Sequence, residues 1–232
     1  MGEHLGEKLI LTVKIGGYPI SLDLITVLTS WLVMLILVLG ALILRRGLRP
    51  PEEEPTKAQA FLEWVVGTLQ RQLGAGFGSR ELGRRLFPLV ATIFLFVLLS
   101  NWLSIIPGLQ SPTADLNVTL SLAIMVFLLS HYFGMRQKGL LGYAKGFIEP
   151  KMIFPLSLIL NFAGELAKPI SHSFRLFGNV LGGGILIGII FSFMPLVVPA
   201  VLHAVYDLFI GAVQAIVFAF LAVTYINIAV ER

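Results

Sequence analysis

The sequence predicts an all-α polytopic membrane protein with about five crossings, because of its composition, its long uncharged runs and the placement of its basic residues. Of its 232 residues, 56% are hydrophobic and only 13% are charged, whereas an average soluble domain has about 25% charged residues. Five uncharged runs are each long enough to cross a hydrocarbon core, which takes about 20 residues. These runs are 24–44, 86–114, 116–135, 176–206 and 208–230.

The chain reads as a single membrane domain over residues 1–232. The expected segments are an extracytoplasmic, β-like or irregular tail at 1–22, a span at 24–44, an amphipathic helix at 56–73, spans at 86–106 and 116–135, and two long helices at 152–193 and 197–230. Asp115 is a good N-cap for the third span. The amphipathic helix is expected on the cytoplasmic membrane surface, and packing of this helix on the protein itself is an equally favoured alternative.

The basic residues set the expected topology. The loop 45–85 carries eight Lys and Arg residues, the loop 107–115 carries none, and the loop 136–151 carries four. Cytoplasmic loops are enriched in Lys and Arg, so the first and third of these loops are placed inside. The N-terminus is therefore expected outside and the C-terminus in the cytoplasm. The N-terminus lacks the composition of a transit peptide, which favours a bacterial plasma membrane.

The last two helices are too long to stand upright in a bilayer. A helix over residues 152–193 would be about 63 Å long at 1.5 Å per residue, whereas the hydrocarbon core is about 30 Å thick. It must therefore tilt strongly, kink or break, and Pro169 and the glycine run 182–184 are the expected places for a bend. We expect a long, strongly tilted hairpin.

A polar stripe runs along the first helix of this hairpin. Its members recur at steps of 4, 3, 4, 3 and 4, which places them on one helical face: Asn161, Glu165, Lys168, His172, Arg175 and Asn179. An ionisable residue at bilayer depth costs from about 3 to more than about 10 kcal/mol, so it is by default a functional hypothesis. The second helix carries His203, Asp207 and Gln214 on its own stripe, which can face the first across the hairpin.

A purely structural interpretation of these two rows is that they hydrogen-bond the helices together, with Arg175 permanently paired to Asp207 or Glu165. A transport path is favoured, because polar side chains within spans usually face water-filled cavities or ion routes. No cofactor or metal is expected: the chain has no cysteine, and His203 with Asp207 lacks a third ligand. The glycine run has no Gly-Lys-Ser/Thr after it, so no nucleotide site is expected, and the charge pattern does not indicate nucleic-acid binding.

Several segments resemble subunit a of the membrane sector of F-type rotary ATP synthases. The motifs are KPISHSFRLFGN at 168–179 and QAIVFAFLAVTYI at 214–226, supported by LLSNWLSIIPG and SPTADLNVTLSLA in the second and third spans. The resemblance implies a non-catalytic stator subunit with two offset half-channels, which protonate and deprotonate the carboxylates of a rotating c ring and couple proton flow to ATP synthesis. It also implies the c-subunit ring, the b-subunit peripheral stalk, other ATP synthase subunits and membrane lipid as partners.

The resemblance assigns roles to individual positions. Arg175 matches the arginine that separates the half-channels and pairs with the ring carboxylate. Gln214 matches a glutamine of the last helix, and Ser171 and Asn179 match positions that line the polar surface. The remaining ion-translocation candidates are Asp207, His203, His172, Glu165, Lys168 and Asn161.

The chain departs from the family pattern at three positions. Gly184 stands where many members have glutamate, Asp207 where many have histidine, and Asn161 where some have an acid. We therefore expect the ionisable group of the outer half-channel on the last helix, with His203 one turn away as a helper. The main alternative is an independent secondary transporter with broken helices, although no second copy of the motif is present. A purely structural membrane subunit would not explain a buried arginine.

Overall fold

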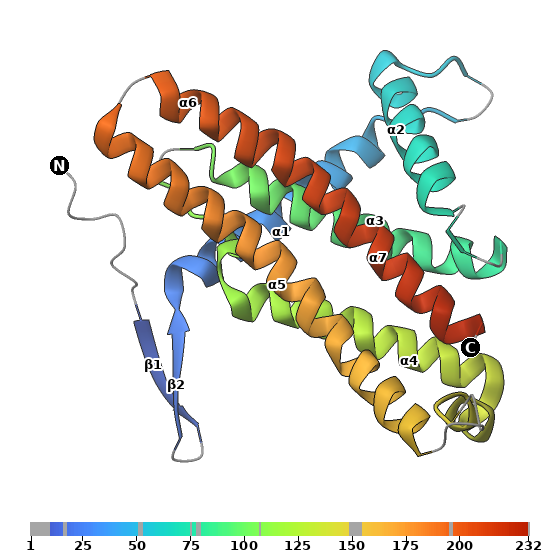
Figure 1. The fold of residues 1–232 in the computed structure, drawn as a ribbon. Coiled ribbons are helices and arrows are strands. Elements are labelled where there is room, and N and C mark those ends of the chain that lie inside the picture. Colours follow the sequence, from blue (N-terminus) through green and yellow to red (C-terminus); the bar gives the residue numbers. More distant parts are fainter. Residues whose placement is uncertain are drawn as a thin grey trace.

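The computed structural model describes residues 10–15, 18–50, 53–74, 76–77, 80–106, 108–148, 155–194 and 197–231. Within these residues, five helices are long and apolar enough to cross a membrane, which confirms the predicted all-α polytopic fold. Figure 1 shows the helices as one elongated bundle, with a β-hairpin projecting from the N-terminal end of the first helix.

The elements follow the predicted order. Their bounds are β1 Ile10–Ile15, β2 Tyr18–Asp23, α1 Leu24–Arg46, α2 Lys57–Gly74, α3 Arg80–Leu103, the 3₁₀ turn η1 Pro112–Ala114, α4 Leu116–Gly146, α5 Leu156–Phe193, α6 Val197–His203, the π-helix η3 Ala204–Ile210, and α7 Gly211–Glu231. The described part of the N-terminal tail is the antiparallel pair β1–β2. Asp115 caps α4 as expected, because its Oδ1 accepts the Asn117 N–H at 2.8 Å. Asp23 caps α1 in the same way.

Two helices extend beyond the apolar runs. Helix α3 begins six residues before the expected span, where Arg85 and Glu81 pair at 2.6 Å one turn apart. Helix α4 continues past residue 135 and changes direction at Gly139, whose φ of 73° favours glycine. The segment after this kink folds back, so that Tyr143 packs against the main part of α4 and leaves no room for a Cβ at Gly134.

The core lies among α3, α4, α5 and α7. Helix α7 packs against α3 and α4, and α4 also packs against α5. Fully buried apolar residues join these helices at Val97, Val126, Leu176, Phe218 and Val223. Small residues of α7, such as Ala215, Ala219 and Ala222, let its neighbours approach closely. This packing fixes one face of α5 and leaves the other face uncovered.

Helix α2 has an exposed aromatic face. Its side chains Phe61 and Trp64 are each 63% exposed and stack with centroids 6.2 Å apart. Only Gln59 and Leu73 of this helix are buried. Of the two interpretations left open by the sequence, an amphipathic surface helix fits this exposure better than a helix packed on its own protein.

Helix α5 is one helix of 38 residues that continues through Pro169 and the glycine run. The helix is therefore unbroken at both places where a bend was expected, and its length of about 57 Å still requires tilt in a bilayer. The irregular backbone lies in the other arm of the hairpin, where the π-helix η3 separates α6 from α7. Figure 1 shows α5 running antiparallel to α6 and α7.

Candidate functional site

The polar stripe of α5 lies along the boundary between its covered and uncovered faces. At 100° per residue its six positions span about 80° of the helix circumference, which is wide enough to reach both faces. Glu165 and His172 are buried, Asn161, Lys168 and Asn179 are half-buried, and Arg175 is exposed. The stripe is therefore not a uniformly buried polar row.

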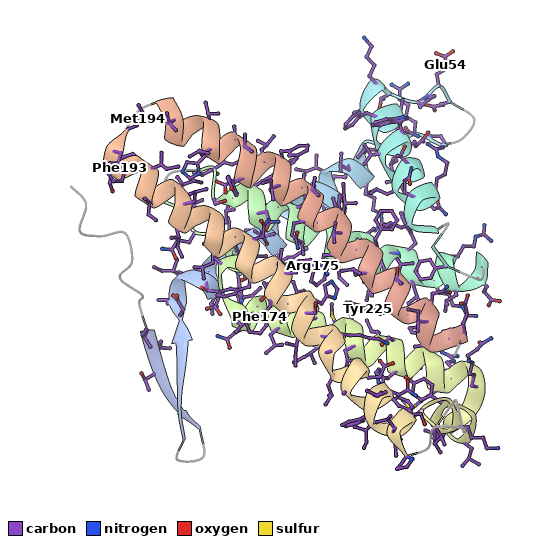
Figure 2. All side chains as sticks on the ribbon, in the orientation of Figure 1. Glu54, Phe174, Arg175, Phe193, Met194 and Tyr225 are labelled. Atoms are coloured by element: carbon purple, nitrogen blue, oxygen red, sulfur yellow. The ribbon has the colours of Figure 1, made fainter. Side chains whose placement is uncertain are left out.

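Arg175 lies midway along α5 on the boundary of its uncovered face (Figure 2). The apolar neighbours Phe174 and Ile170 are both more than half exposed. Among the residues that the structure describes, no carboxylate lies within 4 Å of the Arg175 guanidinium. The alternative in which Arg175 is permanently paired to Asp207 or Glu165 is therefore wrong for this structure.

Glu165 and Asp207 each have another cationic or basic neighbour. The Lys168 Nζ donates to Glu165 Oε1 at 2.7 Å, and Lys168 also lies 5.7 Å from the centroid of the Tyr225 ring on α7. The His203 Nδ1 lies 2.6 Å from Asp207 Oδ2, which brings together the two residues that the sequence placed one turn apart. Each of the two carboxylates is thus paired with a residue of its own helical segment, and the two pairs lie on opposite sides of Arg175 along the hairpin.

His172 is 1% exposed and packs between α5 and α7. Its ring lies tilted by 34° against the Phe218 ring with centroids 3.7 Å apart, and it packs edge-on against the Tyr225 ring with centroids 5.6 Å apart. Together with Lys168 and Glu165, it forms a group of polar and aromatic side chains on the N-terminal half of α5. We call Glu165, Lys168, His172 and Tyr225 the N-terminal cluster.

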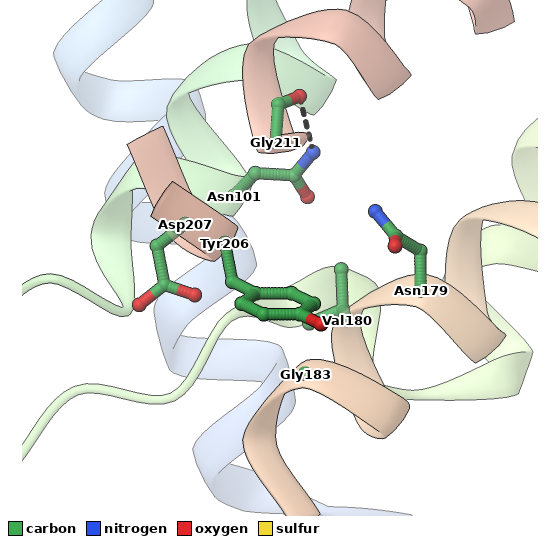
Figure 3. A pocket seen from close by; sticks show the side chains of 7 residues that line it. All are labelled: Asn101, Asn179, Val180, Gly183, Tyr206, Asp207 and Gly211. Carbon is green, nitrogen blue, oxygen red and sulfur yellow. Dashed lines mark hydrogen bonds between the residues drawn. The ribbon is translucent and has the colours of Figure 1, made fainter. Parts of the chain in front are cut away.

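A small cavity lies on the other side of Arg175, where α3, α5 and η3 meet. Its volume is about 10 Å³, close to the room that one water molecule needs. The lining residues are Asn101, Asn179, Val180, Gly183, Tyr206, Asp207 and Gly211 (Figure 3). In this view the Tyr206 ring lies between the Asp207 carboxylate and the Asn179 carboxamide. Both predicted polar rows therefore reach this cavity, one through Asn179 and the other through Asp207.

The other predicted residues are dispersed. The Asn161 side chain donates to the Phe147 carbonyl at 2.9 Å and so joins α5 to the end of α4. Ser171 is exposed, one turn before Arg175. Gln214 is buried on α7, next to the core residue Ala215. No group of three His, Asp or Glu side chains that could hold a metal ion occurs within the described ranges.

Asn101 and Tyr206 are cavity residues that sequence reasoning missed. Asn101 is 2% exposed and carries the only amide side chain of the uncharged run 86–106, and a buried amide at such a position is itself a signal of a polar site. Tyr206 carried no such signal, because its place depends on the π-helix and on Gly183. A Cβ at position 183 would lie 2.9 Å from the Tyr206 ring.

Comparison with known proteins identifies the family. The family model described as ATP synthase A chain matches residues 27–227, which is most of the chain. The chain belongs to the ATP synthase A chain family. This confirms the family that the RLFGN motif suggested, and it places the chain in the membrane sector of an F-type ATP synthase as an ion-translocating subunit.

Curated relatives in this family cover nearly the same span. ATP synthase subunit a 1 of Syntrophotalea carbinolica is 40% identical over 210 residues, covering 90% of this chain and 87% of the relative. ATP synthase subunit a 1 of Chlorobaculum parvum is 36% identical and covers 97% of this chain and 96% of the relative. The sodium ion specific ATP synthase subunit a of Propionigenium modestum is 36% identical, covering 91% of this chain and 74% of the relative.

Proposed function

We propose that this ATP synthase subunit is the non-catalytic stator that exchanges protons with the carboxylates of a rotating c ring, through two half-channels separated by Arg175. The observation that carries the proposal is the exposed Arg175 guanidinium, which has no acidic partner within the described part of the chain and lies midway along a membrane-length helix. A cation so placed is costly in lipid, so a carboxylate supplied by another subunit is its natural partner.

The two polar groups on either side of Arg175 fit two offset half-channels. The cavity with Asp207, His203 and Asn179 lies toward the C-terminal half of α5, and the N-terminal cluster lies toward the other end. A proton entering at one group would have to travel with the ring to leave at the other. Arg175, lying between them, would prevent a direct leak, because a guanidinium stays protonated at all relevant pH values.

The energies are compatible with reversible pairing. Two unit charges 4 Å apart attract by about 4 kcal/mol at an effective dielectric constant of 20. Moving one charge across 100 mV supplies about 2.3 kcal/mol. Because these energies are of similar size, a ring carboxylate can bind Arg175 and also be driven past it.

The proposed location is the plasma membrane of a bacterium, with the N-terminus outside and the C-terminus in the cytoplasm. Gln110 is exposed in the loop that precedes α4, and Gln137 is exposed within α4 just before its kink at Gly139. The chain has no native cysteine. We predict that Gln110→Cys reacts with a membrane-impermeant maleimide from the outside, and that Gln137→Cys reacts only in inverted vesicles. Labelling of both cysteines from one side would contradict the topology.

Co-purification tests the proposed assembly. A tag on this chain should retrieve a ring-forming proteolipid, peripheral-stalk subunits and a soluble ATPase from gently solubilised membranes. Reconstituted complexes should then acidify vesicles on ATP addition without any requirement for Na⁺. Retrieval of the chain alone, active in ion exchange, would favour an independent transporter, and Na⁺-dependent pumping would show that the ion carried is sodium.

A further inference from the structure

We propose that Asn101 and Trp102 of α3 are positioning residues that hold η3 in its π-helical register and so keep Asp207 at the cavity. The inference rests on the proposed function, which gives Asp207 its role in ion transfer. Asn101 and Trp102 lie outside the polar rows that the sequence indicated. The proposal is that they determine the helical geometry of the last membrane crossing.

Both side chains donate hydrogen bonds to backbone carbonyls at η3. The Asn101 Nδ2 donates to the Gly211 carbonyl at 2.9 Å, and the Trp102 Nε1 donates to the Leu208 carbonyl at 3.1 Å. These acceptors lie at and just before the junction of η3 with α7. A π-helical turn is rare, and it is found frequently at functional sites.

Asn101 is itself oriented by a chain of hydroxyl groups. The Thr113 hydroxyl donates to Asn101 Oδ1 at 2.6 Å, and the Ser111 and Thr113 hydroxyl oxygens are also 2.6 Å apart. With its oxygen engaged by Thr113, the carboxamide turns its NH₂ group toward Gly211 (Figure 3). Gly211 permits the approach, because a Cβ there would lie 2.9 Å from the Asn101 Cβ.

The register decides where Asp207 and Tyr206 point. A shift of one residue turns a helix by about 100° relative to the segment beyond the shift. If η3 relaxed to an α-helix while α7 stayed in the core, Tyr206 would leave Gly183 and Asp207 would leave the cavity. The hydrogen bonds from Asn101 and Trp102 oppose this relaxation at both acceptors.

Disulfide cross-linking reports the register directly. An ideal Cβ at Gly183 lies 3.5 Å from the Tyr206 Cβ, and one at Gly76 lies 3.9 Å from the Val223 Cβ. Both distances suit a disulfide. The pair Gly183→Cys with Tyr206→Cys therefore senses η3, whereas Gly76→Cys with Val223→Cys senses α7 beyond it and serves as the matched control.

The test is run in membranes that contain the assembled complex. Asn101→Leu with Trp102→Phe removes both donors and keeps most of the volume, and we expect the η3 cross-link to form about tenfold less while the control cross-link is unchanged. Thr113→Val should lower the η3 cross-link in the same direction. Ser104→Ala, which removes a hydrogen bond only to the carbonyl of Asn101, should change neither.

Two outcomes would overturn the inference: an unchanged η3 cross-link in the double variant, and an equal fall of both cross-links. Normal ATP-driven pumping by the double variant, without introduced cysteines, when only the η3 cross-link is lost would instead contradict the proposed role of Asp207 in ion transfer. Disulfide formation is measured without a transport assay. The cross-links therefore test the helical register of η3 even if the proposed function is wrong.

Discussion

Replacement of Arg175 by alanine is expected to abolish ATP-driven ion pumping while leaving the complex assembled. The side chain is exposed, and within the described residues it makes no ion pair, so the fold does not depend on it. Its loss removes the fixed cation that would stabilise the ionised ring carboxylate and separate the two polar groups. The measurement is ATP-driven acidification of inverted vesicles, with the subunit content of each preparation determined in parallel.

Arg175→Lys should fail nearly as severely. Lysine is a compact point charge that can lose its proton when desolvated, whereas the guanidinium cannot. A matched control is Arg136→Ala, which removes an exposed arginine from α4 and should pump normally. Near-normal pumping by Arg175→Lys would show that a positive charge alone is sufficient.

Asp207→Asn is expected to cut ion translocation severely. The substitution keeps the volume of the side chain and can still hydrogen-bond to His203, but it removes the titratable proton at the cavity. Pumping should therefore fall while assembly is retained. Full activity of Asp207→Asn would exclude this carboxylate from the ion path.

A glutamate at position 184 should restore part of the lost activity. Gly183 lines the cavity with Asp207, and its neighbour Gly184 has no other atom within 4 Å of an ideal Cβ. This open space leaves room for a longer side chain at position 184. Gly184→Glu alone should still lower pumping, because two nearby acids disfavour each other's ionisation. If Asp207→Asn loses pumping activity and Gly184→Glu restores none of it, position 184 does not lie on the ion path that contains Asp207.

Hydrophobic run length and capping act locally, and they were sufficient to predict the five membrane-crossing segments and the start of α4. Asp115 and the apolar run after it predict the start of α4, and the structure has that cap. The end of α4 was not predictable in the same way. Beyond residue 135 the chain continues as helix, and the fold-back at Gly139 is stabilised by packing of Tyr143 against Gly134, a contact that no short pattern encodes.

The sequence could predict which polar residues share a face of α5, but not which of them would be buried. The alternating spacing of three and four residues placed Glu165, Arg175 and Asn179 within about 80° of the α5 circumference. It could not predict which edge of this stripe the neighbouring helices would bury. That depends on how α4 and α7 pack. The π-helix escaped prediction because helical periodicity assumes a uniform turn, and Asn101 and Trp102, which bind it, lie more than 100 residues away.

The most direct test of the central claim is cross-linking from the uncovered face of α5 to the ring. Phe174 is 53% exposed beside Arg175, and Leu128 is 60% exposed on α4, so single cysteines at these positions form a matched pair in a chain without native cysteine. With a short photoactivatable maleimide, Phe174→Cys should capture the ring proteolipid and stop ATP-driven pumping, whereas Leu128→Cys should capture none. Failure of Phe174→Cys to capture the proteolipid in assembled, active complexes would contradict the account.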